Sequence, residues 1–298
     1  MGACGVGRPH AIPSEPGRRT QEGHHVSTGQ GIEEVRLARS ALFVPGDRPD
    51  RFDKAVASGA DLVVCDLEDA VSTERKDLAR TEVTAWLDGG AKACVRLNPP
   101  GSPHHEADVE RLAGVEGVTA VLVPKAEDAE TLRSTAVALD APVVALIETA
   151  VGISRAAELA SVPGVVRLGF GHLDYSVDIG ASGTHTAMLS ARCAVVLASR
   201  LAGLAGPLDG VTPQFDDEEA LAADAAHARE LGFTGKFLIH PRQVPGTHAA
   251  WAPSPEQVEW ARRVVEAAAA GGAVQVDGAM VDGPVVAHAR AILRSHRR

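Results

Sequence analysis

The sequence predicts an α/β protein that folds as a (β/α)8 TIM barrel, and two observations carry this prediction. From Ser40 onward, short apolar or β-branched runs alternate with longer amphipathic, alanine-rich stretches, which is typical of parallel strands joined by helices. Eight such runs occur, and eight parallel strands separated by helices close most naturally into a barrel. A doubly wound open sheet is the alternative, but no Gly-x-Gly-x-x-Gly turn follows an early strand.

Each expected strand is a run of four or five residues, and each expected helix is a longer stretch with an apolar face. The expected strands are residues 41–44, 62–66, 93–97, 120–123, 143–147, 165–168, 207–211 and 236–239. The expected helices are residues 51–58, 73–87, 126–139, 152–160, 186–205 and 218–231. The length of 298 residues suits one barrel with an appendage.

The chain is expected to divide into three parts. Residues 1–35 are rich in Gly, Pro, Ser and His and lack an apolar period, so we expect a disordered extension. Residues 36–252 contain the eight runs and form the expected catalytic barrel. Residues 253–298 follow the barrel as its C-terminal appendage.

The composition argues against several classes of protein. A formal net charge of −10 and an aromatic content of 3% leave little basic surface and few stacking platforms, so no nucleic-acid binding is expected. Cys4, Cys65, Cys94 and Cys193 show no paired spacing, which favours reduced thiols over a zinc site or a disulfide framework. No apolar run approaches the roughly 18 residues of a membrane span. Since the start also lacks the apolar core of a secretory signal, we expect a cytoplasmic protein.

Polar residues gather where the expected strands end. The carboxyl ends of all the strands of a barrel lie on one face, where such folds keep their chemistry. The segments concerned are Asp66-Leu-Glu68-Asp69, Arg96-Leu-Asn98, Pro124-Lys125, Glu148, His172 with Asp174, and His240-Pro-Arg-Gln243. A face that serves stability alone has no need of an arginine among several acids, so the sequence predicts a functional site here.

Glu148 and Asp174 each follow a buried run, and as a pair they favour a hard divalent cation such as Mg²⁺, which binds a few carboxylate oxygens together with substrate and water. Arg96 stands on an apolar strand, where a guanidinium needs a carboxylate partner or a substrate anion. Simpler structural roles remain possible for four of these residues. Asp66 and Asp69 could cap the next helix, Lys125 could be a solvated rim residue, and His240 could be a turn residue.

Eight ordered segments resemble the HpcH/HpaI aldolase and citrate lyase beta-subunit family. They are 39–49 (RSALFVPGDRP), 66–71 (DLEDAV), 95–98 (VRLN), 123–125 (VPK), 146–150 (LIETA), 169–174 (GFGHLD), 239–243 (IHPRQ) and 280–284 (MVDGP). The resemblance extends from Arg39 to Leu293 and implies a barrel with Mg²⁺ on Glu148 and Asp174. It also implies that residues 253–298 form a helical lid on a neighbouring subunit of a homotrimer or hexamer.

The resemblance implies roles for further residues. Arg96 would bind a substrate carboxylate, and Asp66 and Glu68 would orient metal-bound water or Arg96. Acyl-CoA lyases of the family carry a catalytic Asp in a Met-Ile-Asp-x-Pro segment, which corresponds here to Asp282. Alone, Asp282 would read as an ordinary turn acid. Contacts with the substrate or with coenzyme A (CoA) are expected from Arg96, Phe43, Arg48, Lys125, His240 and Gln243.

The expected activity is therefore a Mg²⁺-dependent carbon–carbon lyase reaction. A 3-hydroxyacyl-CoA thioester of the malyl, citramalyl or citryl type would be cleaved by a retro-Claisen mechanism into acetyl-CoA and a 2-oxo acid. Three alternatives remain: malyl-CoA thioesterase or malate synthase chemistry on the same scaffold, a CoA-free aldolase for 4-hydroxy-2-oxo acids, and a citrate lyase beta subunit that depends on a carrier protein.

Two positions depart from the pattern of the family. His172 stands where many relatives have a small residue, so the pocket beside Asp174 is expected to be narrower or to prefer a more polar acyl group. Ala279 replaces a long polar residue that is common before the lid motif, which weakens the expected contact between the lid and CoA.

Overall fold

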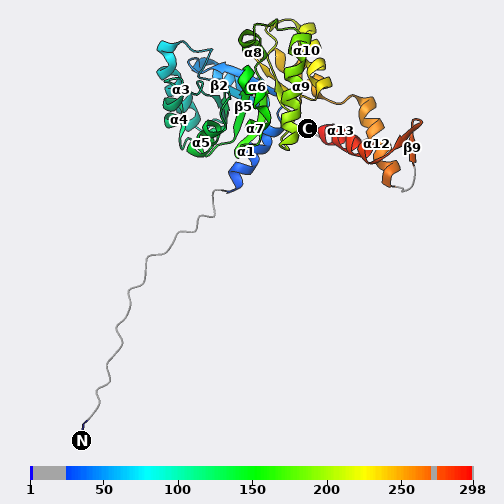
Figure 1. Cartoon of the computed structure of the whole chain (residues 1–298), viewed down its shortest axis with the longest axis horizontal. Helices are drawn as coiled ribbons and strands as arrows, with labels where there is room; N and C mark the ends of the chain where they lie inside the picture. Colours follow the sequence, from blue (N-terminus) through cyan, green and yellow to red (C-terminus); the bar gives the residue numbers. More distant parts are fainter. Residues whose placement is uncertain (3–24, 270–273, 297–298) are drawn as a thin grey trace.

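Eight parallel strands form a closed barrel in the order β1 to β8, with β8 paired to β1 (Figure 1). The structure is a computed structural model, and it describes residues 1–2, 25–269 and 274–296. The strands are β1 (Ser40–Pro45), β2 (Leu62–Asp66), β3 (Ala93–Arg96), β4 (Val118–Val123), β5 (Val143–Ile147), β6 (Val165–Phe170), β7 (Leu208–Asp209) and β8 (Gly235–Leu238). The predicted (β/α)8 barrel is confirmed.

Helices surround the barrel wall, as the alternating pattern of the sequence predicts. They are η1 (Pro49–Arg51), α2 (Phe52–Ala57), η2 (Thr73–Arg75), α3 (Lys76–Asp88), α4 (His105–Leu112), α5 (Ala129–Leu139), α6 (Ala150–Ser154), α7 (Ala156–Ala160), α8 (His172–Asp178), α9 (His185–Leu201), α10 (Glu218–Leu231) and α11 (Gln243–Trp251). The expected helix 152–160 is two short helices, because Arg155 leaves helical geometry with φ −108° and ψ 7°. The short helices α4, α8 and α11 were not expected from periodicity.

The strands separate two buried apolar layers because successive side chains of a strand point to opposite faces. On β2, Val64 belongs to a cluster with Leu146 and Phe237, which also line the barrel mouth, so this cluster fills the barrel interior. Val63, the preceding residue, belongs to the layer between the barrel wall and the helices. Cys65 and Cys94 are buried free thiols on opposite faces of this wall, and Cys4 lies outside the described residues.

Helix α1 (His25–Leu37) packs against β4 and β6 at the end of the barrel where the strands begin (Figure 1). Val35 is completely buried, and the Nη1 atom of Arg167 on β6 donates to the carbonyls of Val35 and Ala38, both at 2.7 Å. We expected residues 1–35 to be disordered, but in the structure residues 25–35 are helical. Their glycine- and serine-containing sequence has little helix propensity, and tertiary packing with the buried arginine supplies the stability. Residues 3–24 lie outside the described residues.

The C-terminal module consists of α12 (Pro255–Ala269), β9 (Val274–Val276), β10 (Ala279–Val281) and α13 (Gly283–His296). Strands β9 and β10 form an antiparallel hairpin, and the helices share a small core of Val258, Ala261, Val264, Ala289 and Ile292. This module packs mainly on itself and projects from the side of the barrel (Figure 1). Within the described chain, no helix is long and apolar enough to cross a membrane.

Candidate active site

A cavity opens where the barrel strands end, and four of the predicted site residues line it. Its wall includes Glu148 from the end of β5, Asp174 from the first turn of α8, and Arg96 from β3. Phe43 of β1 also lines it and stacks on Phe237 of β8, with ring centroids 5.3 Å apart. The barrel topology therefore brings together residues that are far apart in the sequence.

Glu148 is 3% exposed, and its surroundings press closely on the carboxyl group. Its Oε1 accepts a hydrogen bond from the backbone N–H of Lys125 at 2.8 Å. Gly171 passes so close that a Cβ at that position would overlap Oε2, so only glycine fits beside the acid. Burial, together with the charges of Glu68 and Asp174, raises the pKa of Glu148 to about 8.

Arg96 and Asp66 lie opposite each other on the neighbouring strands β3 and β2, and their side chains form a bidentate ion pair. The Nε and Nη2 atoms of Arg96 donate to the two carboxylate oxygens of Asp66 at 2.7 and 2.6 Å. The guanidinium also lies over the ring of Phe43, 4.6 Å from its centroid. Burial by itself would lower the pKa of Arg96, but the charge of Asp66 raises it above its usual value. Arg96 is thus a permanent cation whose orientation is already set.

Glu68 is buried, at 4% exposure, and neither carboxylate oxygen has a hydrogen-bond partner. Its nearest charged neighbours are Nη1 of Arg96 at 3.0 Å and Nζ of Lys125 at 3.5 Å. Burial raises the pKa of Glu68 to about 7, with Arg96 acting in the opposite direction. A buried carboxylate without hydrogen-bond donors is costly, and the adjacent charges of Arg96 and Lys125 offset part of that cost.

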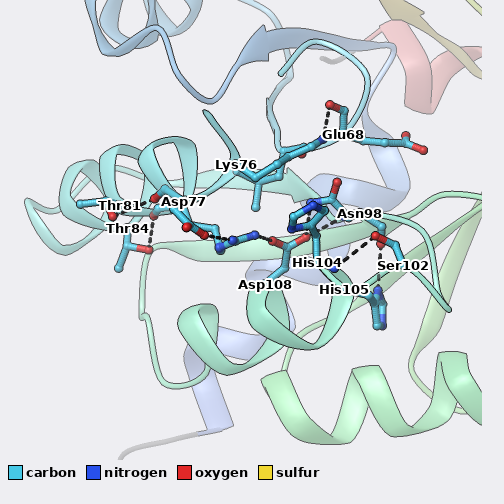
Figure 2. Close-up of polar contacts among 12 residues, drawn as sticks. Glu68, Lys76, Asp77, Thr81, Thr84, Asn98, Ser102, His104, His105 and Asp108 are labelled. Atoms are coloured by element: carbon cyan, nitrogen blue, oxygen red, sulfur yellow. Dashed lines mark hydrogen bonds and ion pairs between the residues drawn. The ribbon is translucent and has the colours of Figure 1, made fainter. Parts of the chain in front are cut away.

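Lys76 supports the loop of acids from behind. Its Nζ, buried beneath the loop, donates to the carbonyls of Leu67 and Glu68, both at 2.6 Å. Figure 2 shows Lys76 reaching the backbone of Glu68 while the carboxylate of Glu68 points the other way. Sequence reasoning missed Lys76, because a lysine at the start of an amphipathic helix reads as a solvated residue.

A second buried network fixes the chain that follows Arg96 (Figure 2). Asp108 of α4 is fully buried and accepts from the backbone N–H and the side-chain amide of Asn98, both at 2.7 Å. Its other oxygen accepts from Nη1 of Arg80 at 2.8 Å, and Nδ1 of His105 lies 2.8 Å from the carbonyl of Asn98. No local sequence pattern predicts these pairings, because the partners come from three different segments of the chain.

The residues expected to contact CoA occupy different settings. Lys125 has a left-handed backbone conformation, with φ +47°, and its Nζ lies 3.5 Å from Oε1 of Glu68, but it is not among the residues that line the cavity. Arg48 is paired with Asp50 at 3.0 Å on the surface. The ring of His240 packs on Phe215, with centroids 4.8 Å apart. These settings leave Arg48 and His240 accessible beside the mouth.

Gln243 was expected to contact CoA, but its side chain is 1% exposed and committed to the protein backbone. Its Oε1 accepts from the N–H of Ile239 at 3.0 Å, and its Nε2 donates to the carbonyl of Thr212 at 2.9 Å. In the structure, Gln243 therefore joins the loops after β7 and β8, and any effect on CoA would pass through the loop that carries His240.

Asp282 does not line the cavity of its own chain. Its Oδ1 accepts from the backbone N–H of Val285 at 3.1 Å, so it caps the start of α13 in the C-terminal module. The module packs on its own core at the side of the barrel (Figure 1). One chain by itself thus does not bring Asp282 to Glu148 and Asp174.

The acids of the cavity fit a divalent cation that shares its ligands with water and substrate. In the described part of the chain, no three His, Cys, Asp or Glu side chains converge to form a complete protein cage. Glu148 and Asp174 offer carboxylate oxygens. The charge of Glu68, whose carboxylate oxygens accept no hydrogen bond, acts on Glu148 together with that of Asp174. Two carboxylates with open positions are the arrangement that Mg²⁺ commonly takes in enzymes.

Comparison with known proteins agrees with this arrangement. A model of the HpcH/HpaI aldolase/citrate lyase family matches residues 39–241. The chain belongs to this family. A Mycobacterium tuberculosis protein, named citrate lyase subunit beta-like protein, is 37% identical over 261 residues, which are 85% of this chain and 93% of that protein. A (3S)-malyl-CoA thioesterase of Cereibacter sphaeroides is 35% identical over 267 residues, which are 86% of this chain and 93% of that protein.

A solved structure of this family has the same fold. It is the crystal structure of CitE from Mycobacterium tuberculosis in complex with magnesium, acetoacetate and coenzyme A. The two structures superpose with a TM-score of 0.79 at 36% sequence identity, covering 88% of this chain and 100% of that chain. Members of the family are enzymes of the citrate lyase and aldolase type, and magnesium is bound in homologous structures.

The raised pKa values predict how pH and Mg²⁺ act together on stability. Glu68 and Glu148 bind protons more tightly when folded than at their ordinary pKa of 4.5, so without metal these two groups lower the free energy of unfolding as pH rises from about 4.5 to about 8. Mg²⁺ needs the ionised carboxylates, so its stabilising effect should grow over the same interval. Thermal melts with and without Mg²⁺, at about pH 6 and about pH 8.5, measure this. A Mg²⁺-induced rise in Tm that is no larger at the higher pH would contradict it.

Proposed function

We propose that this protein is a Mg²⁺-dependent carbon–carbon lyase. It would cleave a 3-hydroxyacyl-CoA thioester of the malyl, citramalyl or citryl type into acetyl-CoA and a 2-oxo acid. The observation that carries the proposal is one cavity lined by the buried acid Glu148, by Asp174 and by the oriented cation Arg96, with the buried acid Glu68 3.0 Å from that cation. The magnesium, acetoacetate and coenzyme A bound to the M. tuberculosis CitE support the same class of ligand.

Glu148 and Asp174 would hold the metal. When bound, Mg²⁺ supplies positive charge that stabilises the negative charge developing on the oxo-acid oxygens during cleavage. Glu68, whose oxygens have no donors in the protein, would accept hydrogen bonds from water in the same space. Each of the three acids would thus have a role in the proposed reaction.

Arg96 would bind the carboxylate of the substrate. Asp66 holds the Nε and Nη2 edge of the guanidinium, so the Nη1 edge beside Glu68 is the one that can turn to a ligand. A guanidinium that is oriented before the substrate arrives loses little entropy on binding. Arg96 would therefore set the direction in which the 2-oxo acid half of the substrate lies.

The proton in this reaction would come from a second subunit. As the C3 hydroxyl loses its proton to water and becomes the carbonyl of the 2-oxo acid, the electron pair of the broken C2–C3 bond passes to the thioester fragment, and a carboxylic acid then protonates the carbon next to the thioester carbonyl. Asp282 is our candidate for this acid, and it does not line the cavity of its own chain. We propose that the C-terminal module closes over a neighbouring subunit in a cytoplasmic homotrimer or hexamer.

A shared site predicts complementation between inactive variants. Asp282→Asn is expected to lower the rate by about a hundred-fold or more with little change in substrate affinity, because it removes a proton donor and no binding charge. Mixing Asp282→Asn subunits with Arg96→Ala subunits should restore part of the activity, since some sites then combine two intact halves. The measurement is turnover of the mixture after dissociation and reassembly, with each variant alone as control. Mixed oligomers that stay inactive would count against a site shared between subunits.

The proposed activity is tested by Mg²⁺-dependent release of a 2-oxo acid from malyl-, citramalyl- and citryl-CoA. A sample treated with EDTA serves as control. Release from any of the three would support the carbon–carbon lyase and name the substrate. Free CoA without an oxo acid would instead support a thioesterase, which the 35% identity to a (3S)-malyl-CoA thioesterase makes the second candidate.

The same assay separates the remaining readings. Citrate lyase subunit beta of Escherichia coli is 35% identical over 292 residues, so a thioester on a carrier protein is a further substrate to offer. Turnover only with the carrier thioester would identify a subunit that depends on partners. Cleavage of a 4-hydroxy-2-oxo acid without any thioester would identify a CoA-free aldolase.

A further inference from the structure

His172 occupies a confined position in the wall of the cavity. It is the first residue of α8, two residues before Asp174, and it is 8% exposed. Its ring lies against Phe170, with centroids 6.5 Å apart. On the other side Gly210 packs so closely that a Cβ there would overlap Nδ1 of His172. The imidazole is therefore held at the cavity by contacts on two sides.

The polar atoms of this ring have no partner within the described protein. Nδ1 is fully buried without a hydrogen bond, whereas Nε2 is not enclosed in the same way. Since His172 lines the cavity, the hydrogen-bonding capacity of Nε2 is available to whatever occupies the space next to Asp174. The imidazole thus limits the space for a ligand and presents one polar atom, Nε2, to it.

Most of the remaining cavity wall is apolar. Its apolar side chains are Leu146, Phe170, Leu173, Val211, Phe237 and Ile239. Arg96 is the one cation among the described residues that line the cavity, and it is already paired with Asp66 and Glu68. A ligand that places one carboxylate at Arg96 finds no second positive charge along this wall.

The two nearby buried cations, Arg192 and Lys236, are already paired with protein groups. Arg192 of α9 is buried and donates to Asp209 at 2.9 Å. Lys236 of β8 is 1% exposed, and its Nζ donates to the carbonyl of Gly210 and lies 3.8 Å from Asp209. A second carboxylate buried beside His172 would find no side-chain cation of the protein to pair with, which is energetically costly.

We propose that His172 determines which substrates the enzyme accepts, by limiting them to thioesters that release a 2-oxo acid with one carboxylate and a small uncharged substituent, hydrogen or methyl. This inference rests on the proposed function. The carboxylate of the oxo acid lies at Arg96, and the imidazole fills the space beside Asp174 that a larger substituent would need. A citryl-type thioester is disfavoured by size and by charge, because its oxo acid carries a second carboxylate.

The experiment is calorimetric titration of the full-length protein with 2-oxo acids in the presence of Mg²⁺. Glyoxylate, pyruvate, 2-oxobutyrate and freshly prepared oxaloacetate are compared. Wild-type protein should bind glyoxylate or pyruvate about ten-fold or more tightly than 2-oxobutyrate or oxaloacetate. In His172→Ala, 2-oxobutyrate should gain about ten-fold relative to pyruvate, because the space for its extra methylene has opened. Oxaloacetate should stay weak, because the substitution adds no cation.

Val177→Ala is the matched control. Val177 lies on the same helix, is 81% exposed, and is not part of the cavity wall. Its removal should leave the order of affinities unchanged. A change in Val177→Ala as large as that in His172→Ala would overturn the inference, because it would show a general effect of α8.

The contact between His172 and Gly210 gives a second, independent test. Gly210→Ala should displace the imidazole and weaken the binding of pyruvate, since its Cβ takes the place of Nδ1. In a His172→Ala background the same change should cost much less, which is a coupling that a double-mutant cycle measures. Additive effects would overturn the proposed packing. If His172→Ala does not fold, His172→Gln, which shortens the bulk but keeps a polar side chain, takes its place in the titrations.

The outcomes distinguish this inference from the function on which it rests. Unchanged relative affinities in a folded His172 variant would overturn the role of His172 and leave the lyase standing. Tightest binding of oxaloacetate by the wild type, lost in His172→Ala, would also overturn it, because His172 would then bind a carboxylate. If the wild type binds no 2-oxo acid in a Mg²⁺-dependent way, the proposed function fails and this inference fails with it.

Discussion

Replacing Glu148 with glutamine, or Asp174 with asparagine, is expected to abolish Mg²⁺-dependent turnover while the barrel stays folded. Each amide keeps the shape of the side chain and removes the negative charge that would hold the cation. The loss should be about a thousand-fold or more, because the charge developing in the transition state would have no counter-ion. The measurements are the rate of 2-oxo acid release and the rise in Tm on adding Mg²⁺.

Stability separates loss of metal from loss of fold. The pKa of Glu148 is raised to about 8 by burial, so its ionisation opposes folding at neutral pH. Glu148→Gln without metal should therefore be at least as stable as the wild type near pH 7, and it should lose the Mg²⁺-induced rise in Tm. Glu158→Gln, an exposed acid on α7, is the control and should keep both activity and Mg²⁺ response. Full activity in both site variants would rule out the metal assignment.

Arg96→Ala is expected to remove activity and to destabilise the protein strongly. Asp66 is 1% exposed and Glu68 is 4% exposed, so loss of the guanidinium leaves Asp66 without its bidentate partner and Glu68 without its nearest cation. Breaking a buried pair from one side commonly costs about 3–5 kcal/mol. For a domain of this size that corresponds to a fall in Tm of roughly 10 °C, which thermal unfolding without metal measures.

A double variant tests whether the stability lost in Arg96→Ala comes from leaving the carboxylate of Asp66 without its partner. Arg96→Ala combined with Asp66→Asn removes both charges and keeps a side-chain oxygen that can accept from the backbone N–H groups of Glu68 and Ala70, so much of the lost stability should return although activity stays absent. Arg133→Ala removes an exposed arginine paired with Glu130 on α5 and should change Tm by little. A double variant as unstable as Arg96→Ala would show that the guanidinium stabilises the protein through packing on Phe43 instead of through charge.

The strands were predictable because a parallel strand in a barrel is buried on both faces. Residues 143–147 read as one continuous apolar run, and the structure buries every residue of β5. The two-residue strand β7 is shorter than the expected 207–211, because its chain turns into the loop that carries Gly210 and Thr212. Helix α1 was not predictable, because packing on the barrel and bonds from Arg167, more than a hundred residues away, hold it.

The candidate site was predictable as a set of residues, because each member directly follows an apolar run and a barrel brings all such ends together. Its internal pairings were not. The sequence placed Arg96, Asp66 and Glu68 in one region, but only the structure shows that Asp66 neutralises Arg96 while Glu68 has no hydrogen-bond donor. The role of Gln243 was also not predictable. Its position after β8 suggested a ligand contact, but its side chain is buried and bonds the backbone of the loops after β7 and β8.

Hydrophobic periodicity and residue type are local properties, so the sequence was sufficient to predict the barrel, the face on which the site lies and the chemistry that its side chains can perform. The three-dimensional packing was needed to show which acid lacks a hydrogen-bond donor, which buried lysine supports the loop of acids, and how Gly210 confines His172. It also decided that Asp282 caps α13 outside its own cavity. These features depend on distances and burial between elements far apart in the chain, which a linear pattern does not carry.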